Sequence, residues 1–137
     1  MSRAFIDTNI LIYFSTGETS KGEITRKLLE MPKEFFISQQ VLNEFAAVCI
    51  RKRLLSLSAI KKYVKEFDIY FNAALMNSQT VLNGLSLIEK YSFSYWDSLI
   101  LASAIDSNCS VLYSEDLQHN QKISFSKKHI SIINPFV

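Results

Sequence analysis

Glycine and proline are scarce in this chain of 137 residues, which has three glycines and two prolines. Because β-sandwiches and β-barrels need frequent tight turns, this scarcity argues against an all-β fold and favours long regular elements. The two cysteines, Cys49 and Cys109, lie in apolar segments without a second Cys or His at metal-ligand spacing. They are therefore predicted to be buried free thiols.

Long apolar runs are also missing. No run approaches about 20 residues, and no basic segment followed by an apolar one opens the chain. Hydrophobic residues make up 48% of the chain and charged residues 20%, a balance typical of proteins that fold around a core. We therefore expect a cytoplasmic protein without a membrane segment, which forms a single domain over residues 1–137.

Short apolar segments alternate with helical patterns along the chain. Strands are predicted at 4–6, 35–37, 73–76, 111–113 and 130–133, and helices at 9–15, 21–31, 39–53, 59–70, 79–90 and 95–106, with Ser58 and Ser78 as N-caps. This alternation predicts an α/β fold with a parallel sheet that is covered on both faces. In such sheets, ligands bind beyond the carboxyl ends of the strands.

Four acidic residues fit that edge of the predicted sheet. Asp7 directly follows the first strand, and Asp116 comes three residues after the fourth. Asp97 lies in the first turn of an apolar helix, and Glu44 borders the apolar stripe of another. Each also has a simpler interpretation: a helix cap, a turn residue, a residue favoured by the helix dipole, or a boundary glutamate paired with Lys52.

Taken together, the four acids predict a metal site. Two carboxylates about 4 Å apart repel by roughly 4 kcal/mol in a medium of intermediate dielectric, so a cluster needs bound protons or a divalent cation. Oxygen ligands without Cys or His favour Mg²⁺ or Mn²⁺ over Zn²⁺. The natural chemistry is phosphodiester hydrolysis. The rest of the chain has an excess of basic residues, which suits a polyanionic substrate.

Four segments that span essentially the whole chain resemble the PIN-domain family. In order, they are FIDTNILIYF, ISQQVLNEF, YWDSLILASA and VLYSEDLQH. Within that family, the sequence is most similar to the VapC-type toxins of bacterial type II toxin–antitoxin pairs. The resemblance implies a three-layer α/β/α fold with a five-stranded parallel sheet, and an endoribonuclease that depends on Mg²⁺ or, alternatively, Mn²⁺. It also implies an RNA substrate, an antitoxin partner and a homodimer.

The resemblance assigns roles to individual residues. Four residues match the acidic quartet of the family: Asp7, Glu44, Asp97 and Asp116. The resemblance implies catalytic and metal-binding roles for all four. Of these, Asp7 and Asp97 look like the most direct metal ligands, while Asn9 and Ser114 match supporting polar positions. Asn120 stands where such toxins often have Gly, but Asn tolerates the left-handed backbone conformation.

Other functions fit the sequence less well. One alternative is a non-catalytic RNA-binding or assembly module on the same fold, and another is a housekeeping ribonuclease without an antitoxin. A phosphatase or a phosphate-accepting receiver domain is disfavoured because residue 9 is Asn, so no Asp-x-Asp follows the first strand. A nucleotide kinase or a dehydrogenase is excluded more firmly, because the chain has no glycine-rich phosphate loop.

Overall fold

The first strand of the chain lies in the interior of a six-stranded sheet. In the computed structural model, which describes residues 1–17 and 19–137, the strand order is β3-β2-β1-β4-β6-β5. The strands are β1 (Arg3–Ile6), β2 (Glu34–Ser38), β3 (Asn72–Ala74), β4 (Val111–Tyr113), β5 (Lys122–Phe125) and β6 (Lys128–Ile133). All neighbours pair in parallel except β5, which runs antiparallel to β6.

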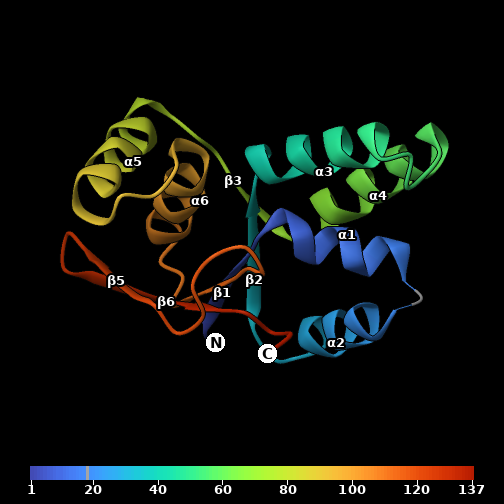
Figure 1. Ribbon diagram of the computed structural model, residues 1–137, viewed down its shortest axis with the longest axis horizontal. Helices are drawn as coiled ribbons and strands as arrows, with labels where there is room; N and C mark the ends of the chain where they lie inside the picture. Colours follow the sequence, from blue (N-terminus) through green and yellow to red (C-terminus); the bar gives the residue numbers. More distant parts are fainter. Residues whose placement is uncertain (18) are drawn as a thin grey trace.

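Helices cover both faces of this sheet. They are α1 (Thr8–Thr16), α2 (Ser20–Leu29), α3 (Gln39–Arg51), α4 (Leu57–Tyr70), α5 (Ser78–Tyr91) and α6 (Tyr95–Asp106). Figure 1 shows α1 to α4 gathered on one side of β1 and β2, with α5 and α6 on the other side. The predicted α/β/α architecture is therefore confirmed, and the five predicted parallel strands are all present.

The sixth strand, β5, was not predicted. It forms a hairpin with β6, in which Phe125 pairs with Lys128 across a turn of two residues. Both turn residues, Ser126 and Lys127, have positive φ angles, of 49° and 64°. Such turns usually contain Gly or Asn, so a Ser-Lys pair gives no recognisable hairpin signal in the sequence.

Two predicted helix caps are wrong by one or two residues. The cap of α4 is Ser56, not Ser58, because the Ser56 hydroxyl accepts a hydrogen bond from the Ala59 amide at 3.1 Å. The cap of α5 is Asn77, not Ser78, and it forms a reciprocal capping box with Thr80. In both helices the side chain of the residue before the first helical position binds the third amide of the helix, as N-caps generally do.

The register of the sheet sets the position of the functional edge. Ile6, the last residue of β1, pairs with Tyr113, the last residue of β4. The Asp7 amide also donates to the Tyr113 carbonyl at 3.1 Å, so Asp7 and Ser114 follow the sheet side by side. Packing around β1 makes this edge rigid, because Phe5 and Ile6 are fully buried.

Two further predictions concern the cysteines and membrane-spanning segments. Cys49 and Cys109 are buried free thiols, as predicted. Among the residues that the structure describes, no helix is both long enough and apolar enough to cross a bilayer.

Candidate active site

One cavity of about 470 Å³ lies at the carboxyl edge of the sheet, and all four predicted acids line it. Asp7 comes from the junction of β1 and α1, and Glu44 from α3. Asp97 comes from the first turn of α6, and Asp116 from the loop after β4. The chain thus brings together four acids from four separate segments.

Asp7 is both a helix cap and a cavity residue. Its side chain caps α1, and one carboxylate oxygen accepts a hydrogen bond from the Thr8 amide at 2.7 Å. The other oxygen accepts from the Ser114 hydroxyl at 2.8 Å. Only 6% of the residue is exposed, and this burial raises the pKa of Asp7 to about 6 against the effect of the two hydrogen bonds. The nearby charges of Glu44 and Asp116 are smaller contributions to the same rise in pKa.

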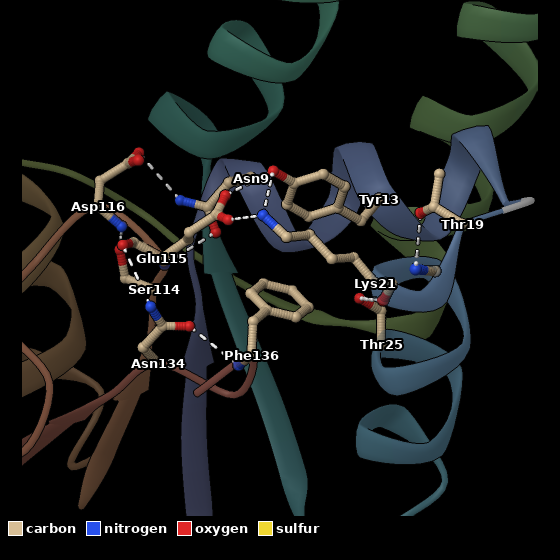
Figure 2. A network of polar contacts seen from close by, with 11 residues as sticks. Asn9, Tyr13, Thr19, Lys21, Thr25, Ser114, Glu115, Asp116, Asn134 and Phe136 are labelled. Atoms are coloured by element: carbon tan, nitrogen blue, oxygen red, sulfur yellow. Dashed lines mark hydrogen bonds and ion pairs between the residues drawn. The ribbon is translucent and has the colours of Figure 1, made fainter.

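Asn9 holds the loop that carries Asp116. Its amide nitrogen donates to the Asp116 carboxylate at 3.0 Å, and its amide oxygen accepts from the Glu115 backbone at 3.2 Å. The Ser114 hydroxyl accepts from the Asp116 amide at 3.2 Å (Figure 2). The predicted supporting positions, Asn9 and Ser114, therefore both contact members of the acidic set directly.

Glu44 is held by two residues whose roles were not predicted. The Thr8 hydroxyl donates to one of its carboxylate oxygens at 2.9 Å, and the Gln40 amide donates to the other at 3.0 Å. The same Gln40 nitrogen also donates to the Trp96 carbonyl at 3.1 Å. The spacing of Gln40 and Glu44, four residues apart on a helix, is a signal that the sequence does contain. Among the described residues, Lys52 forms no ion pair with Glu44.

Asp97 lies at the third position of α6, where its backbone amide donates to the capping hydroxyl of Ser94 at 3.2 Å. The residue is half-buried. Burial raises the pKa of Asp97, as do the charges of Asp116 and Glu44, while the Ser94 side chain lowers it. Asp7 and Asp97 thus share one property: both carboxyl groups lose hydration in this cavity and hold protons more tightly than usual.

The donor chemistry of the cavity fits a hard divalent cation. Its acidic, amide and hydroxyl groups offer oxygen ligands, and no histidine or cysteine is among the described residues that line it. Within the described residues, no three His, Cys, Asp or Glu side chains form a ready-made metal cluster. Mg²⁺ is usually held by only one or two carboxylates and keeps several waters, so Asp7 and Asp97 with assistance from Glu44 and Asp116 are sufficient donors.

A fifth acid, Glu115, also lines the cavity. Its negative charge is compensated by hydrogen bonds and an ion pair. The Tyr13 hydroxyl donates to one of its carboxylate oxygens at 2.6 Å, and Lys21 forms an ion pair with the other. Burial raises the pKa of Glu115, but the hydrogen bonds from Lys21 and Tyr13 outweigh it and hold this pKa below its usual range. Tyr13 and Lys21 were not predicted as site residues, because no local sequence pattern connects them to Glu115.

Solved structures with a similar fold include proteins of toxin–antitoxin systems. A toxin–antitoxin complex from Klebsiella pneumoniae superposes with a TM-score of 0.70 at 19% identity, and covers 96% of this chain and 97% of that chain. VapC20 of Mycobacterium tuberculosis, a toxin that cleaves the sarcin–ricin loop, has a TM-score of 0.68 at 12% identity over 82% of this chain and 91% of that one.

A third neighbour is VapBC2 from Rickettsia felis bound to a DNA fragment from its promoter, with a TM-score of 0.64 at 17% identity over 85% and 89% of the two chains. At these identities, the likeness establishes the fold. No curated protein matches the sequence significantly. The profile of the PIN domain matches residues 4–122, and these residues contain the four acids of the cavity. The chain therefore belongs to the PIN-domain family.

Proposed function

We propose that this chain is a metal-dependent endoribonuclease and acts as the toxin of a type II toxin–antitoxin pair. The observation that carries this proposal is the convergence of Asp7, Glu44, Asp97 and Asp116 on one cavity. A pure binding module has no need for four acids that raise one another's cost of ionisation. Membership of the PIN-domain family and the toxin–antitoxin neighbours support the same function.

In this proposal, each acid has a defined part. Asp7 and Asp97 bind Mg²⁺, with Mn²⁺ as the alternative, while Glu44 and Asp116 complete the site and orient water. When bound, the ion supplies an activated water and neutralises charge on the phosphate. Asn9 keeps the Asp116 carboxylate turned toward the cavity, since its amide donates to that carboxylate at 3.0 Å.

Basic residues at the cavity rim are proposed to bind the RNA backbone. Arg51 ends α3 and Lys52 follows it, and both line the cavity that holds the acids. Positive charge at this place offsets the repulsion between the acids and the phosphates of the substrate. This combination favours a nucleic acid over a small neutral substrate.

The proposed partners are an antitoxin, which would cover the acidic cavity, and a second copy of the chain. Three solved neighbours support an antitoxin partner, because they are themselves toxin–antitoxin complexes: the Klebsiella pneumoniae complex, VapBC2 from Rickettsia felis, and VapBC-1 from nontypeable Haemophilus influenzae. The proposed location is the cytoplasm. The antitoxin proposal predicts that growth arrest on expression of this chain is relieved by its cognate antitoxin.

The decisive experiment measures cleavage of RNA by the purified chain with Mg²⁺ or Mn²⁺. We expect cleavage by the unaltered chain, and its loss in Asp7→Asn, in Asp97→Asn and after chelation by EDTA, because each change removes the cation or its proposed ligands. A matched control is Asp68→Asn, which removes an exposed carboxylate on α4 outside the cavity. Cleavage that survives both cavity substitutions, or survives EDTA, would refute the proposal. RNA binding without any cleavage would instead identify a non-catalytic module.

A further inference from the structure

Lys21, in the first turn of α2, reaches the loop that follows β4. Its ammonium group forms an ion pair with the Glu115 carboxylate, 94 residues further along the chain. The same group lies 4.9 Å from the ring centre of Tyr13 and 5.4 Å from that of Phe136. Figure 2 shows Lys21 extended between these two rings toward Glu115. We call these four residues the Lys21 clamp: Tyr13, Lys21, Glu115 and Phe136.

The two aromatic rings beside Lys21 contact each other, and Phe136 is linked to Glu115 through Asn134. The rings of Tyr13 and Phe136 meet edge to face, with centroids 5.2 Å apart at an interplanar angle of 77°. The Phe136 amide donates to the Asn134 side chain at 2.9 Å, and that side chain donates in turn to the Glu115 carbonyl at 3.5 Å. Elements α1, α2 and the segment after β6 therefore all meet at Glu115.

Glu115 stands between two residues of the candidate active site. Its neighbour Ser114 donates to Asp7, and its other neighbour Asp116 accepts from Asn9. The Glu115 amide itself donates to Asn9 at 3.2 Å. Fixing Glu115 therefore restricts the backbone on both sides of it, where Ser114 and Asp116 make their own hydrogen bonds to Asp7 and Asn9.

Lys21 does not line the acidic cavity, whereas Glu115 does. An ion pair on an open surface contributes little, but this one, whose Lys21 and Glu115 side chains are 40% and 23% exposed, is flanked by two rings that favour a cation through their π faces. Without Lys21, a fifth carboxylate would line the cavity without a positive charge beside it, with the Tyr13 hydroxyl still donating to it. Repulsion from the other acids would then move the loop, and Glu115 would compete for the bound cation.

We propose that Lys21 is a positioning residue of the candidate active site: held between the Tyr13 and Phe136 rings, its ammonium pins Glu115 and thereby sets Ser114 and Asp116 against Asp7 and Asn9. The effect on cleavage rests on the proposed ribonuclease function, whereas the effect on the loop does not. Both are measurable separately.

The test compares Lys21→Met, Lys21→Arg and, as a matched control, Lys62→Met. Lys62 forms an ion pair with Glu66 on the surface of α4, away from the cavity. Hydrogen exchange of the Glu115 and Asp116 amides, measured by NMR, reports on the loop, and the kcat and KM for RNA report on the chemistry. In Lys21→Met, we expect both amides to exchange about tenfold faster and kcat to fall by about tenfold, with a nearly unchanged KM and thermal midpoint. Lys21→Arg should restore both, and Lys62→Met should change neither.

The proposal is overturned if both amides exchange at the wild-type rate in Lys21→Met, or if they exchange faster while kcat is unchanged. If the unaltered chain does not cleave RNA, the proposed function fails, and the exchange measurement still decides the role of Lys21. Should Lys21→Met fail to fold, Tyr13→Phe removes only the hydroxyl that donates to Glu115. It should accelerate exchange of the same two amides to a smaller extent, and unchanged exchange there would equally overturn the proposal.

Discussion

At Asp7, one carboxylate serves as a helix cap and as a member of the acidic cavity. The sequence left a helix cap and a metal ligand as alternatives for Asp7, and the structure shows the cap role at a position that lines the cavity, with the two oxygens bound to different partners. One oxygen binds the Thr8 amide at the start of α1, and the other binds the Ser114 hydroxyl. A residue that caps a helix at the end of a central strand is thereby placed at the edge where ligands bind.

Removing the charge of Asp7 should stabilise the metal-free chain. The pKa of this carboxyl is raised from 3.8 to about 6, so the folded state holds the proton more tightly than the unfolded state. Its contribution to the free energy of unfolding is therefore greatest below about pH 4 and is lost as the pH rises toward 6. Asn keeps the capping oxygen, so Asp7→Asn in EDTA should gain about 1–3 kcal/mol near pH 8 and little near pH 4.

Urea unfolding of both chains at the two pH values measures this difference. The same substitution should abolish cleavage of RNA, which is a trade of activity against stability. A variant that is less stable than the unaltered chain near pH 8 would show that the burial of Asp7 costs nothing in the absence of metal.

At the scale of elements, the N-cap of α6 should matter for function and that of α4 should not. Ser94 caps α6 through the Asp97 amide at 3.2 Å, and Ser56 caps α4 through the Ala59 amide at 3.1 Å. Both serines are exposed, and loss of either cap should cost about 1 kcal/mol. Only Ser94→Ala loosens the turn that carries Asp97, so only this variant should also lose activity.

Thermal unfolding and the rate of RNA cleavage, measured for Ser94→Ala and Ser56→Ala side by side, test this expectation. The two variants should unfold at similar temperatures, while the cleavage rate falls several-fold in Ser94→Ala alone. Equal rates in the two variants would mean that the first turn of α6 has no part in placing Asp97.

The elements that the sequence predicts well are those made mainly of apolar residues. Helix α6 was predicted with its observed bounds, and so was β4. Strand β5 was missed because its turn uses Ser126 and Lys127 in the left-handed conformation. Asn120, with a φ of 66°, has the left-handed conformation that the resemblance implied.

In the candidate site, too, some residues could be predicted from the sequence and others could not. The position of Asp7 and Asp116 was predictable because strand ends in a parallel sheet share one edge, and that of Glu44 and Asp97 because each lies beside the apolar face of a helix. Thr8 supports Glu44 through a side-chain contact between α1 and α3, and Lys21 reaches Glu115 over 94 residues. Such contacts depend on the packing of the finished fold, and no local pattern records them.

At the scale of the whole molecule, the two cysteines should report on global unfolding. Cys49 is fully buried and Cys109 is 4% exposed. Burial also raises the pKa of the Cys109 thiol to about 12, and only the thiolate reacts readily with disulfide reagents. We expect neither thiol to react with Ellman's reagent in the folded chain, and both to react once urea unfolds it.

Labelling should therefore follow the urea transition that is measured by circular dichroism. Rapid labelling of either cysteine without denaturant would show a local opening, of α3 for Cys49 or of the segment before β4 for Cys109.

The hydrogen bonds that build the cavity have a further consequence for biosynthesis. Asp7 and Ser114 are separated by 107 residues, and so are Asn9 and Asp116. The amino end of a protein is synthesised first. Strand β1 is therefore complete long before its neighbour β4 has been translated. A nascent chain that ends before Ser114 has the Asp7 carboxylate but lacks the Ser114 hydroxyl that binds it, and it also lacks Asp116. The strand order of the sheet thus leaves the cavity incomplete until the last quarter of the chain is being made.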